Sequence, residues 1–181
     1  GQKVHFFASQ GACYVYDNDG MEGYNDGVAE IQRQIDVNRA NLSSGYTGSV
    51  FFSTSSAILM RHELRESHFK FKALPPAMDW KSKTTLAAPT NIQVQDTVMS
   101  WEHPTAERFT IYIYPRGTAK DNAAAPEYLK TVVYGNSCRM DGWGDLSTKT
   151  IAIYSYDRFG VEHAAAYYEG NEVYEPKVAI R

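Results

Sequence analysis

The stretch Ala87-Ala88-Pro89-Thr90-Asn91 divides the chain into two parts whose hydrophobic patterns differ. After it, apolar and polar residues alternate with the period of two that is typical of β-strands. Before it, apolar runs and segments of helical periodicity follow one another in the order strand, helix, strand, helix. We therefore expect two domains. Residues 1–87 form the first domain with its connector, and residues 88–181 form the second.

The composition excludes several classes of protein. Of 181 residues, 43% are hydrophobic and 22% are charged, which speaks against disorder. A net charge of −3 without a long basic run argues against nucleic acid as the main partner. No apolar stretch reaches the length that spans a bilayer, so we expect no transmembrane segment. Cys13 and Cys138 give neither a disulfide framework nor zinc-ligand spacing, and we expect two free thiols and no cofactor.

The part after residue 88 reads as a series of short strands separated by glycine, proline and asparagine turns. About seven such strands predict a β-sandwich. We expect them at residues 92–94, 98–101, 109–113, 128–134, 137–140, 150–157 and 162–168.

The part before residue 87 predicts two strands that alternate with two helices. We expect strands at 4–8 and 48–53 and helices at 27–42 and 57–66. This order predicts parallel strands joined by right-handed crossovers, and such strands are normally covered on both faces. Two strand–helix units cannot cover both faces of their strands. A complete (β/α)8 barrel would do so, but it needs on the order of 250 residues. We therefore expect the end of a barrel, in a piece of a longer protein, with an exposed sheet edge that favours self-association.

Two sets of residues in the second part resemble a fibronectin type III domain. Ser100-Trp101-Glu102-His103-Pro104 is similar to the family's second strand, in which the tryptophan fills the core. Residues 151–160 are similar to its penultimate strand and the following turn. Lys149 departs from the family, because it stands where the tyrosine of the tyrosine corner is expected. The expected fold class is therefore α/β plus all-β: a partial (β/α)8-barrel end followed by a fibronectin type III-like β-sandwich.

Four segments of the first part resemble the end of the bacterial glycosyl-hydrolase-like ten family. They are Ser9-Gln10-Gly11-Ala12-Cys13-Tyr14-Val15-Tyr16, Glu30-Ile31-Gln32-Arg33-Gln34-Ile35, Gly48-Ser49-Val50-Phe51-Phe52-Ser53 and Leu74-Pro75-Pro76-Ala77-Met78-Asp79-Trp80. The resemblance implies a cell-envelope glycosidase acting on carbohydrate, with peptidoglycan glycan strands as one substrate class. It also implies a periplasmic or cell-surface location, with any secretion signal upstream. The family's main acidic residues belong to earlier strands, so we expect this piece itself to be non-catalytic.

The candidate sugar-binding residues follow from the barrel geometry, because barrels build their sites at the carboxyl ends of their strands. Gln10 and Tyr14 are candidates to hydrogen bond sugar hydroxyls, and Tyr16 and Phe52 are candidates to stack on a sugar ring. Trp143 stands between two glycines of the second part and is a further candidate stacking platform. For each of these residues, packing or capping is the alternative.

Other motifs fail on spacing. The acidic residues of 17–26 lie in one loop with no second carboxylate opposite them, so we expect no catalytic pair. Asp17-Asn18-Asp19-Gly20 resembles the start of a calcium loop, but Val28 occupies the position of the bidentate glutamate. His62 and His68 are six residues apart, whereas a zinc-protease helix places its histidines four apart. We expect no metal site.

Two functions remain open at this point. The chain is the C-terminal part of a cell-envelope glycoside hydrolase with a fibronectin-like accessory or spacer module. Alternatively, it is a free-standing carbohydrate- or protein-binding adaptor module. Two observations would distinguish these functions. A longer reading frame with barrel periodicity upstream would support the first function, and sugar binding by the isolated chain would support the second.

Overall fold

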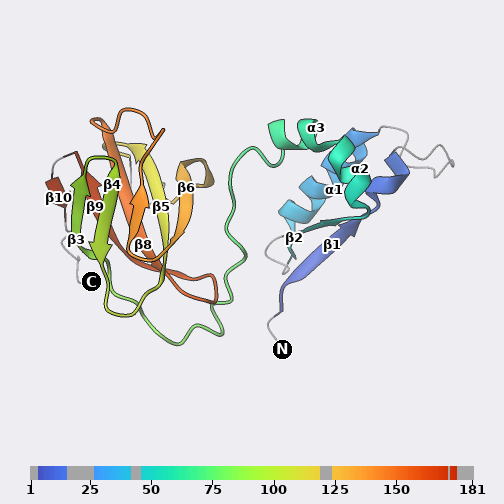
Figure 1. The fold of residues 1–181 in the computed structure, drawn as a ribbon. Helices are drawn as coiled ribbons and strands as arrows, with labels where there is room; N and C mark the ends of the chain where they lie inside the picture. The colour runs from blue at the N-terminus through green and yellow to red at the C-terminus, as the bar shows by residue number, and fades with distance from the viewer. Residues whose placement is uncertain (1–3, 16–26, 42–45, 119–123, 171, 175–181) are drawn as a thin grey trace. The chain divides into compact units, whose positions relative to one another are not determined.

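The computed structural model describes residues 4–15, 27–41, 46–118, 124–170 and 172–174 (Figure 1). The chain divides into two units, residues 1–70 and residues 71–181.

The first unit contains one pair of parallel strands with helices packed beside it. In chain order its elements are β1 (Phe6–Gln10), η1 (Ala12–Val15), α1 (Val28–Ala40), β2 (Tyr46–Phe51), α2 (Thr54–Leu59) and α3 (Arg61–Glu66). The parallel pairing of β1 with β2 is confirmed, and Gln10 lies opposite Phe51. The single helix expected at 57–66 is instead two short helices that meet at the buried Met60.

A small core forms among the helices of the first unit. Ile31 and Ile35 are one helical turn apart on α1 and are almost fully buried. They pack with Ala12, Met60 and Leu64. The strands contribute little to this core, and apolar side chains on or next to them remain exposed. The buried core of the unit therefore lies among its helices, and apolar residues of the strands, such as Phe7 and Val50, remain exposed.

The second unit contains two antiparallel sheets. Its elements are β3 (Thr90–Gln95), β4 (Val98–Glu102), β5 (Arg108–Pro115), η4 (Pro126–Tyr128), β6 (Leu129–Tyr134), β7 (Ser137–Arg139), β8 (Lys149–Tyr156), β9 (Glu162–Glu169) and β10 (Glu172–Tyr174). One sheet has the order β10-β9-β8-β5-β6 and the other β3-β4-β7 (Figure 1). All seven strands expected from the period-two pattern are present within a few residues, and β10 is additional.

The core of the second unit lies between its two sheets. Trp101 of β4 is 3% exposed, and its ring meets the ring of Phe109 of β5 edge to face at 5.2 Å between centroids. The expectation that Trp101 fills the core is confirmed. The remaining buried members are Ile92, Met99, Ala106, Ile111, Ile151, Ile153 and Ala166. Both sheets contribute, so each covers the apolar face of the other.

The five-stranded sheet also buries side chains on its opposite, outer face. Phe109 and Ile111 point into the core, so the residues between and beside them on β5 face outward. Tyr112 and Tyr114 lie on that outer face and are 3% and 5% exposed. They form a second cluster with Leu129 and Ala152, against which Leu74 packs. The outer face is therefore rich in tyrosine and partly covered by chain that precedes β3.

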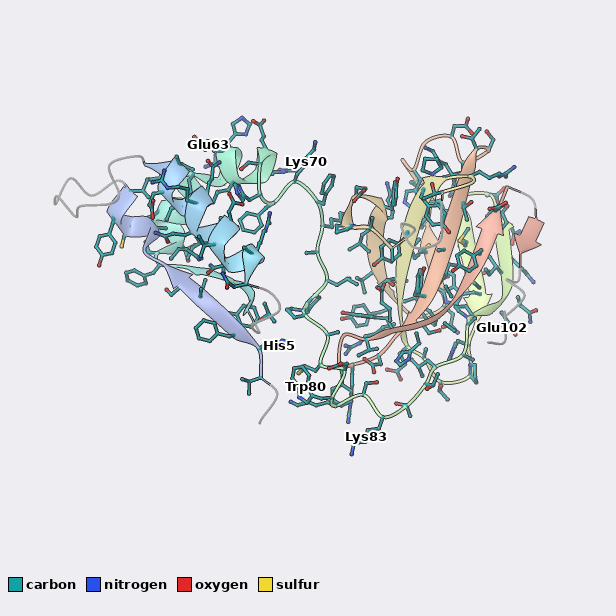
Figure 2. The ribbon with its side chains drawn as sticks, turned by 180° about the vertical axis from the view of Figure 1, so that it is seen from behind. His5, Glu63, Lys70, Trp80, Lys83 and Glu102 are labelled. Atoms are coloured by element: carbon teal, nitrogen blue, oxygen red, sulfur yellow. The ribbon has the colours of Figure 1, made fainter. Side chains whose placement is uncertain are left out.

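The covering chain is the connector, residues 71–87. Met78 N donates to Phe159 O at 2.8 Å, and Ser82 Oγ donates to Asp157 Oδ2 at 2.5 Å. Ala87 O accepts hydrogen bonds from Ser155 Oγ at 2.6 Å and His103 Nε2 at 3.0 Å. Figure 2 shows this connector, with Trp80 and Lys83 labelled on it. From the sequence we expected the connector to belong to the first domain, residues 1–87. These contacts instead join it to the two sheets of the second unit.

The expected fold class is wrong. The described residues do not form a partial (β/α)8-barrel end followed by a fibronectin type III-like sandwich. They form a mostly β structure with three separate sheets and three short α-helices. The parallel pair remains a sheet of two strands, and the adjacent helices close a core of their own rather than covering a longer sheet. A strand-helix alternation specifies parallel pairing locally, but it does not specify how many further strands join.

Candidate functional site

Gln10 lies at the carboxyl end of β1 and is 1% exposed. Its amide orientation follows from its neighbours. The oxygen accepts from Asn38 Nδ2 at 2.6 Å and Ser49 Oγ at 3.1 Å, and the nitrogen donates to Ala8 O at 3.2 Å and Val50 O at 3.1 Å. These four bonds use the hydrogen-bonding capacity of the amide within the unit. Gln10 therefore joins α1 to the strand pair, and its polar atoms are already engaged.

The structure brings Gln10, Tyr14 and Phe52 together at one end of the strand pair. Phe52 N donates to Gln10 O at 3.0 Å, and Cys13 N donates to Phe52 O at 2.9 Å. The side chains differ in exposure, with Tyr14 at 39% and Phe52 at 67%. An exposed aromatic pair at the carboxyl edge is compatible with ring stacking. Tyr16 and the acidic stretch 17–26 lie outside the described residues.

Trp143, the remaining candidate, belongs to the second unit, whereas Gln10, Tyr14 and Phe52 belong to the first. The Trp143 side chain is half-buried. Its ring packs against the core between the two sheets. The Lys130 ammonium lies over the ring, with Nζ 5.6 Å from the centroid. Gly142 and Gly144 both have positive φ, which lets the chain turn tightly on each side of the tryptophan. The ring therefore packs on the core and is not a fully exposed stacking platform.

A cavity of about 330 Å³ lies in the second unit, where the connector meets the outer face of the five-stranded sheet. This volume is at the lower end of small-molecule sites, which span roughly 300–1,000 Å³. Its walls are mainly aromatic, aliphatic and cationic. The lining includes Pro75, Pro76 and Met78 of the connector, Arg108, Tyr134 and Tyr156 of the sheet, and Arg158 and Phe159 of the turn after β8. We name this site the arginine–aromatic cavity.

Strand register places the sheet side chains of this cavity in one row. Arg108 of β5 lies directly opposite Tyr134 of β6, and its guanidinium Cζ is 5.2 Å from the tyrosine ring centroid. Phe109 lies opposite Ser155 of β8, so Tyr156 is the neighbour of Arg108 on the other side. Phe109 points into the core, and Arg108 therefore points to the outer face with both tyrosines.

The turn after β8 supplies the second cation of the cavity. The guanidinium Cζ of Arg158 lies 4.8 Å from the ring centroid of Phe159. Each guanidinium thus lies over an aromatic ring, a cation–π contact. Tyr134 is 71% exposed, whereas Tyr156 is 7% exposed. The cavity accordingly combines an accessible ring with a buried one and with two cations.

The charge around the cavity is not balanced by carboxylates of its lining. None of the lining residues is acidic. Burial raises the pKa of Tyr156, Glu162 raises it further, and the nearby Arg108 opposes the rise. Within the described residues, the ion pairs use cations other than Arg108 and Arg158. Those cations are Arg33, His62, His68, Arg116, Arg139 and His163.

The two carboxylates that also influence Tyr156 are hydrogen bonded to protein donors. Glu162 accepts from Thr110 Oγ1 and from Tyr112 OH, the latter at 2.9 Å. Asp157 accepts from Ser82 Oγ and from the backbone N–H of Phe159 at 2.8 Å and Val161 at 2.9 Å. Burial raises the pKa of Asp157, but these hydrogen bonds outweigh it and the pKa lies below its usual value. Both carboxylates are therefore structural.

Sequence reasoning missed the arginine–aromatic cavity. One signal for it exists, because the alternation along 108–114 places Arg108, Tyr112 and Tyr114 on the face opposite Phe109 and Ile111. The rest of the site had no local signal. Pro75 and Arg158 are far apart in the chain, and only the path of the connector brings them to one cavity.

Among the described residues, no group of three or more His, Cys, Asp or Glu side chains is placed to hold a metal ion. None of the helices in the described ranges has the length and apolar content needed to cross a membrane.

The chain was also compared with known proteins. A scan against protein-family models and searches of curated proteins and of solved structures find no match to it.

Proposed function

We propose that this protein is a carbohydrate-binding module and that the arginine–aromatic cavity is its binding site. The observation that carries the proposal is the exposed ring of Tyr134 at the rim of a cavity of about 330 Å³. Aromatic faces stack on the apolar faces of sugar rings, while nearby polar groups bond their hydroxyls. The volume suits one ring of an oligosaccharide, with its neighbours extending outside.

The cavity supports this proposal better than Gln10 at the end of β1 or Trp143 of the second unit does. Gln10 has its polar atoms engaged within its unit, and the Trp143 ring packs on the core. Tyr134, Tyr156 and Phe159 instead line one concave surface together with donors from two arginines. Concave sites with aromatic walls and a few polar groups are the usual form of small-ligand sites.

A glycan array provides the test. The full chain is applied to oligosaccharides of neutral hexoses, N-acetylhexosamines and hexuronates, and positive probes are titrated by calorimetry. We expect binding to at least one probe, with a loss of about tenfold or more in Tyr134→Ala. Tyr134 is exposed, so its truncation leaves the core intact. Trp143→Ala is the comparison, and we expect it to retain binding whenever the variant is folded.

Binding that disappears in Trp143→Ala and persists in Tyr134→Ala would move the site from the cavity to Trp143. An array without any bound probe would contradict carbohydrate binding altogether.

The strand pair of the first unit supports a second property, self-association. Phe7 is 46% exposed and Val50 is 51% exposed, on β1 and β2 respectively. A sheet of two strands has two edges with unpaired backbone groups, and such edges recruit other strands. A second copy of this chain can cover the apolar surface and pair with an edge. Sedimentation across a range of concentrations tests this property.

A further inference from the structure

We propose that the arginine–aromatic cavity recognises a carboxylate-bearing sugar, a hexuronate unit, rather than a neutral one. This inference rests on the proposed carbohydrate-binding function and specifies the ligand class of the same site. It is carried by Arg108 and Arg158, which enter the cavity from different elements and both stack on aromatic rings.

The stacking geometry leaves the guanidinium groups suited to bind a carboxylate. Arg108 rests over Tyr134 and Arg158 over Phe159. Stacking uses the face of the guanidinium plane, whereas its five N–H donors lie at the edge. Those donors match the two oxygens of a carboxylate in a bidentate arrangement. Both cations therefore lie over rings, and their N–H groups are the donors with which they would bind an anion.

The balance of charge favours an anionic ligand. The lining contains two guanidinium groups and no carboxylate. Asp157 and Glu162, which act on the adjacent Tyr156, are not part of the lining, and Asp157 pairs with His163. A neutral sugar entering the cavity would remove water from two cations and supply no negative charge to compensate for the lost hydration. A carboxylate supplies that charge.

The remaining walls favour a sugar ring over a simple anion or an acidic peptide. Pro75, Pro76 and Met78 of the connector add apolar lining to the rings of Tyr134 and Tyr156 on the sheet. A small inorganic anion would meet the arginines and leave these walls in contact with water. An extended acidic peptide needs a groove or a strand edge, whereas this site is a small cavity. A pyranose ring with a carboxyl group uses both the apolar walls and the cations.

The test compares matched saccharides that differ only in the carboxyl group. Hexuronate oligosaccharides from the array are titrated into the full chain beside the same oligosaccharides after carboxyl reduction to the neutral hexose. We expect the acidic form to bind about tenfold or more tightly, with an affinity that falls as salt rises. Arg108→Gln and Arg158→Gln keep an amide donor and remove the charge, so each should abolish most of this preference.

Arg139→Gln is the matched control. Arg139 lies in the same unit, is exposed and pairs with Asp141 outside the cavity. We expect it to retain the preference for the acidic sugar.

Equal affinity for the acidic and the reduced saccharide would overturn this inference and leave carbohydrate binding intact. A preference that survives in both Arg108→Gln and Arg158→Gln would also overturn it. Absence of binding to every saccharide would instead refute the proposed function. Displacement of the hexuronate by poly-glutamate at comparable residue concentration would assign the site to acidic peptides and overturn the inference.

Discussion

The guanidinium of Arg108 lies over the ring of Tyr134, with 5.2 Å from Cζ to the ring centroid, and the two residues face each other across β5 and β6. The same register puts Phe109 into the core beneath them. The position of the cation is therefore coupled to the packing of the second unit, because a shift of one residue would exchange the two faces of the strand.

The core of the second unit depends on Phe109, which is fully buried and contacts Trp101. Replacing it with alanine removes a large apolar side chain and leaves a cavity. We expect Phe109→Ala to lower the free energy of unfolding by about 3–5 kcal/mol. Urea denaturation of the full chain, followed by tryptophan fluorescence, measures the change. Val98→Ala on β4, where the side chain is 38% exposed, should cost less than about 1 kcal/mol.

The connector is held to the turn after β8 by the bond from Ser82 Oγ to Asp157 Oδ2. A hydrogen bond to a charged group contributes roughly 1.5–3 kcal/mol. We expect Ser82→Ala to destabilise the second unit by about that amount and to speed proteolysis within 71–87. Thr84→Ala, at an exposed position of the same connector, is the control and should change neither. Unchanged cleavage in Ser82→Ala would show that other contacts hold the connector.

Asp157 makes the stability of the second unit depend on pH. Burial raises its pKa, but hydrogen bonds from Ser82, Val161, Phe159 and His163 lower it more, so the folded-state pKa lies below the unfolded value of about 3.9. The folded chain therefore holds the ionised form, and this stabilisation is present above pH about 4 and lost as pH falls through the folded-state pKa. Below pH about 4, unfolding free energy should fall more steeply in the native chain than in Asp157→Asn. Parallel curves from acid titrations would contradict this assignment.

Cys138 is half-buried on β7, and burial raises the pKa of its thiol to about 11. At pH 8 only about one thiol in a thousand is ionised, and the thiolate is the reactive form. In the Cys13→Ser chain we expect alkylation by iodoacetamide to be slow at pH 8 and to rise about tenfold per pH unit up to pH ~10. The same chain in urea supplies the unfolded reference. A rate that levels off below pH 9 would be inconsistent with the raised pKa.

Self-association through the strand pair should depend on Val50, an exposed residue of β2. A lysine on an edge strand opposes pairing with another strand, because its charge would be buried. We expect Val50→Lys to weaken concentration-dependent dimerisation by about tenfold or more, as measured by analytical ultracentrifugation. Val98→Lys introduces the same charge on β4 and should leave dimerisation unchanged. A native chain that stays monomeric at all concentrations would rule out this role of the edge.

Much of the local structure could be predicted because its causes are local. The period of two along 109–113 and 150–157 placed β5 and β8, and the spacing of Ile31 and Ile35 placed the buried face of α1. Trp101 was predicted to fill the core, and it does. The two apolar runs of the first part were predicted to pair in parallel, as β1 and β2 do.

The fold class and the candidate site could not be predicted in the same way. The sequence suggested that the first part continues a barrel, whereas Met60 and Leu64 instead close a small core with α1. Gln10 was selected as a ligand-binding residue from its place at a strand end, but the structure engages its amide with Asn38 and Ser49. Whether a polar side chain remains available depends on neighbours distant in the chain.

The amino-acid sequence by itself determined where the strands and helices lie and which face of each strand is apolar, since these follow from side-chain periodicity over a few consecutive residues. Only the tertiary structure decided that the connector follows the outer face of the five-stranded sheet, bonded from Ser82 to Asp157 across 75 positions of the chain. The arginine–aromatic cavity exists because of that path. Its two cations and its apolar wall come from segments that no local pattern relates, and packing alone brings them together.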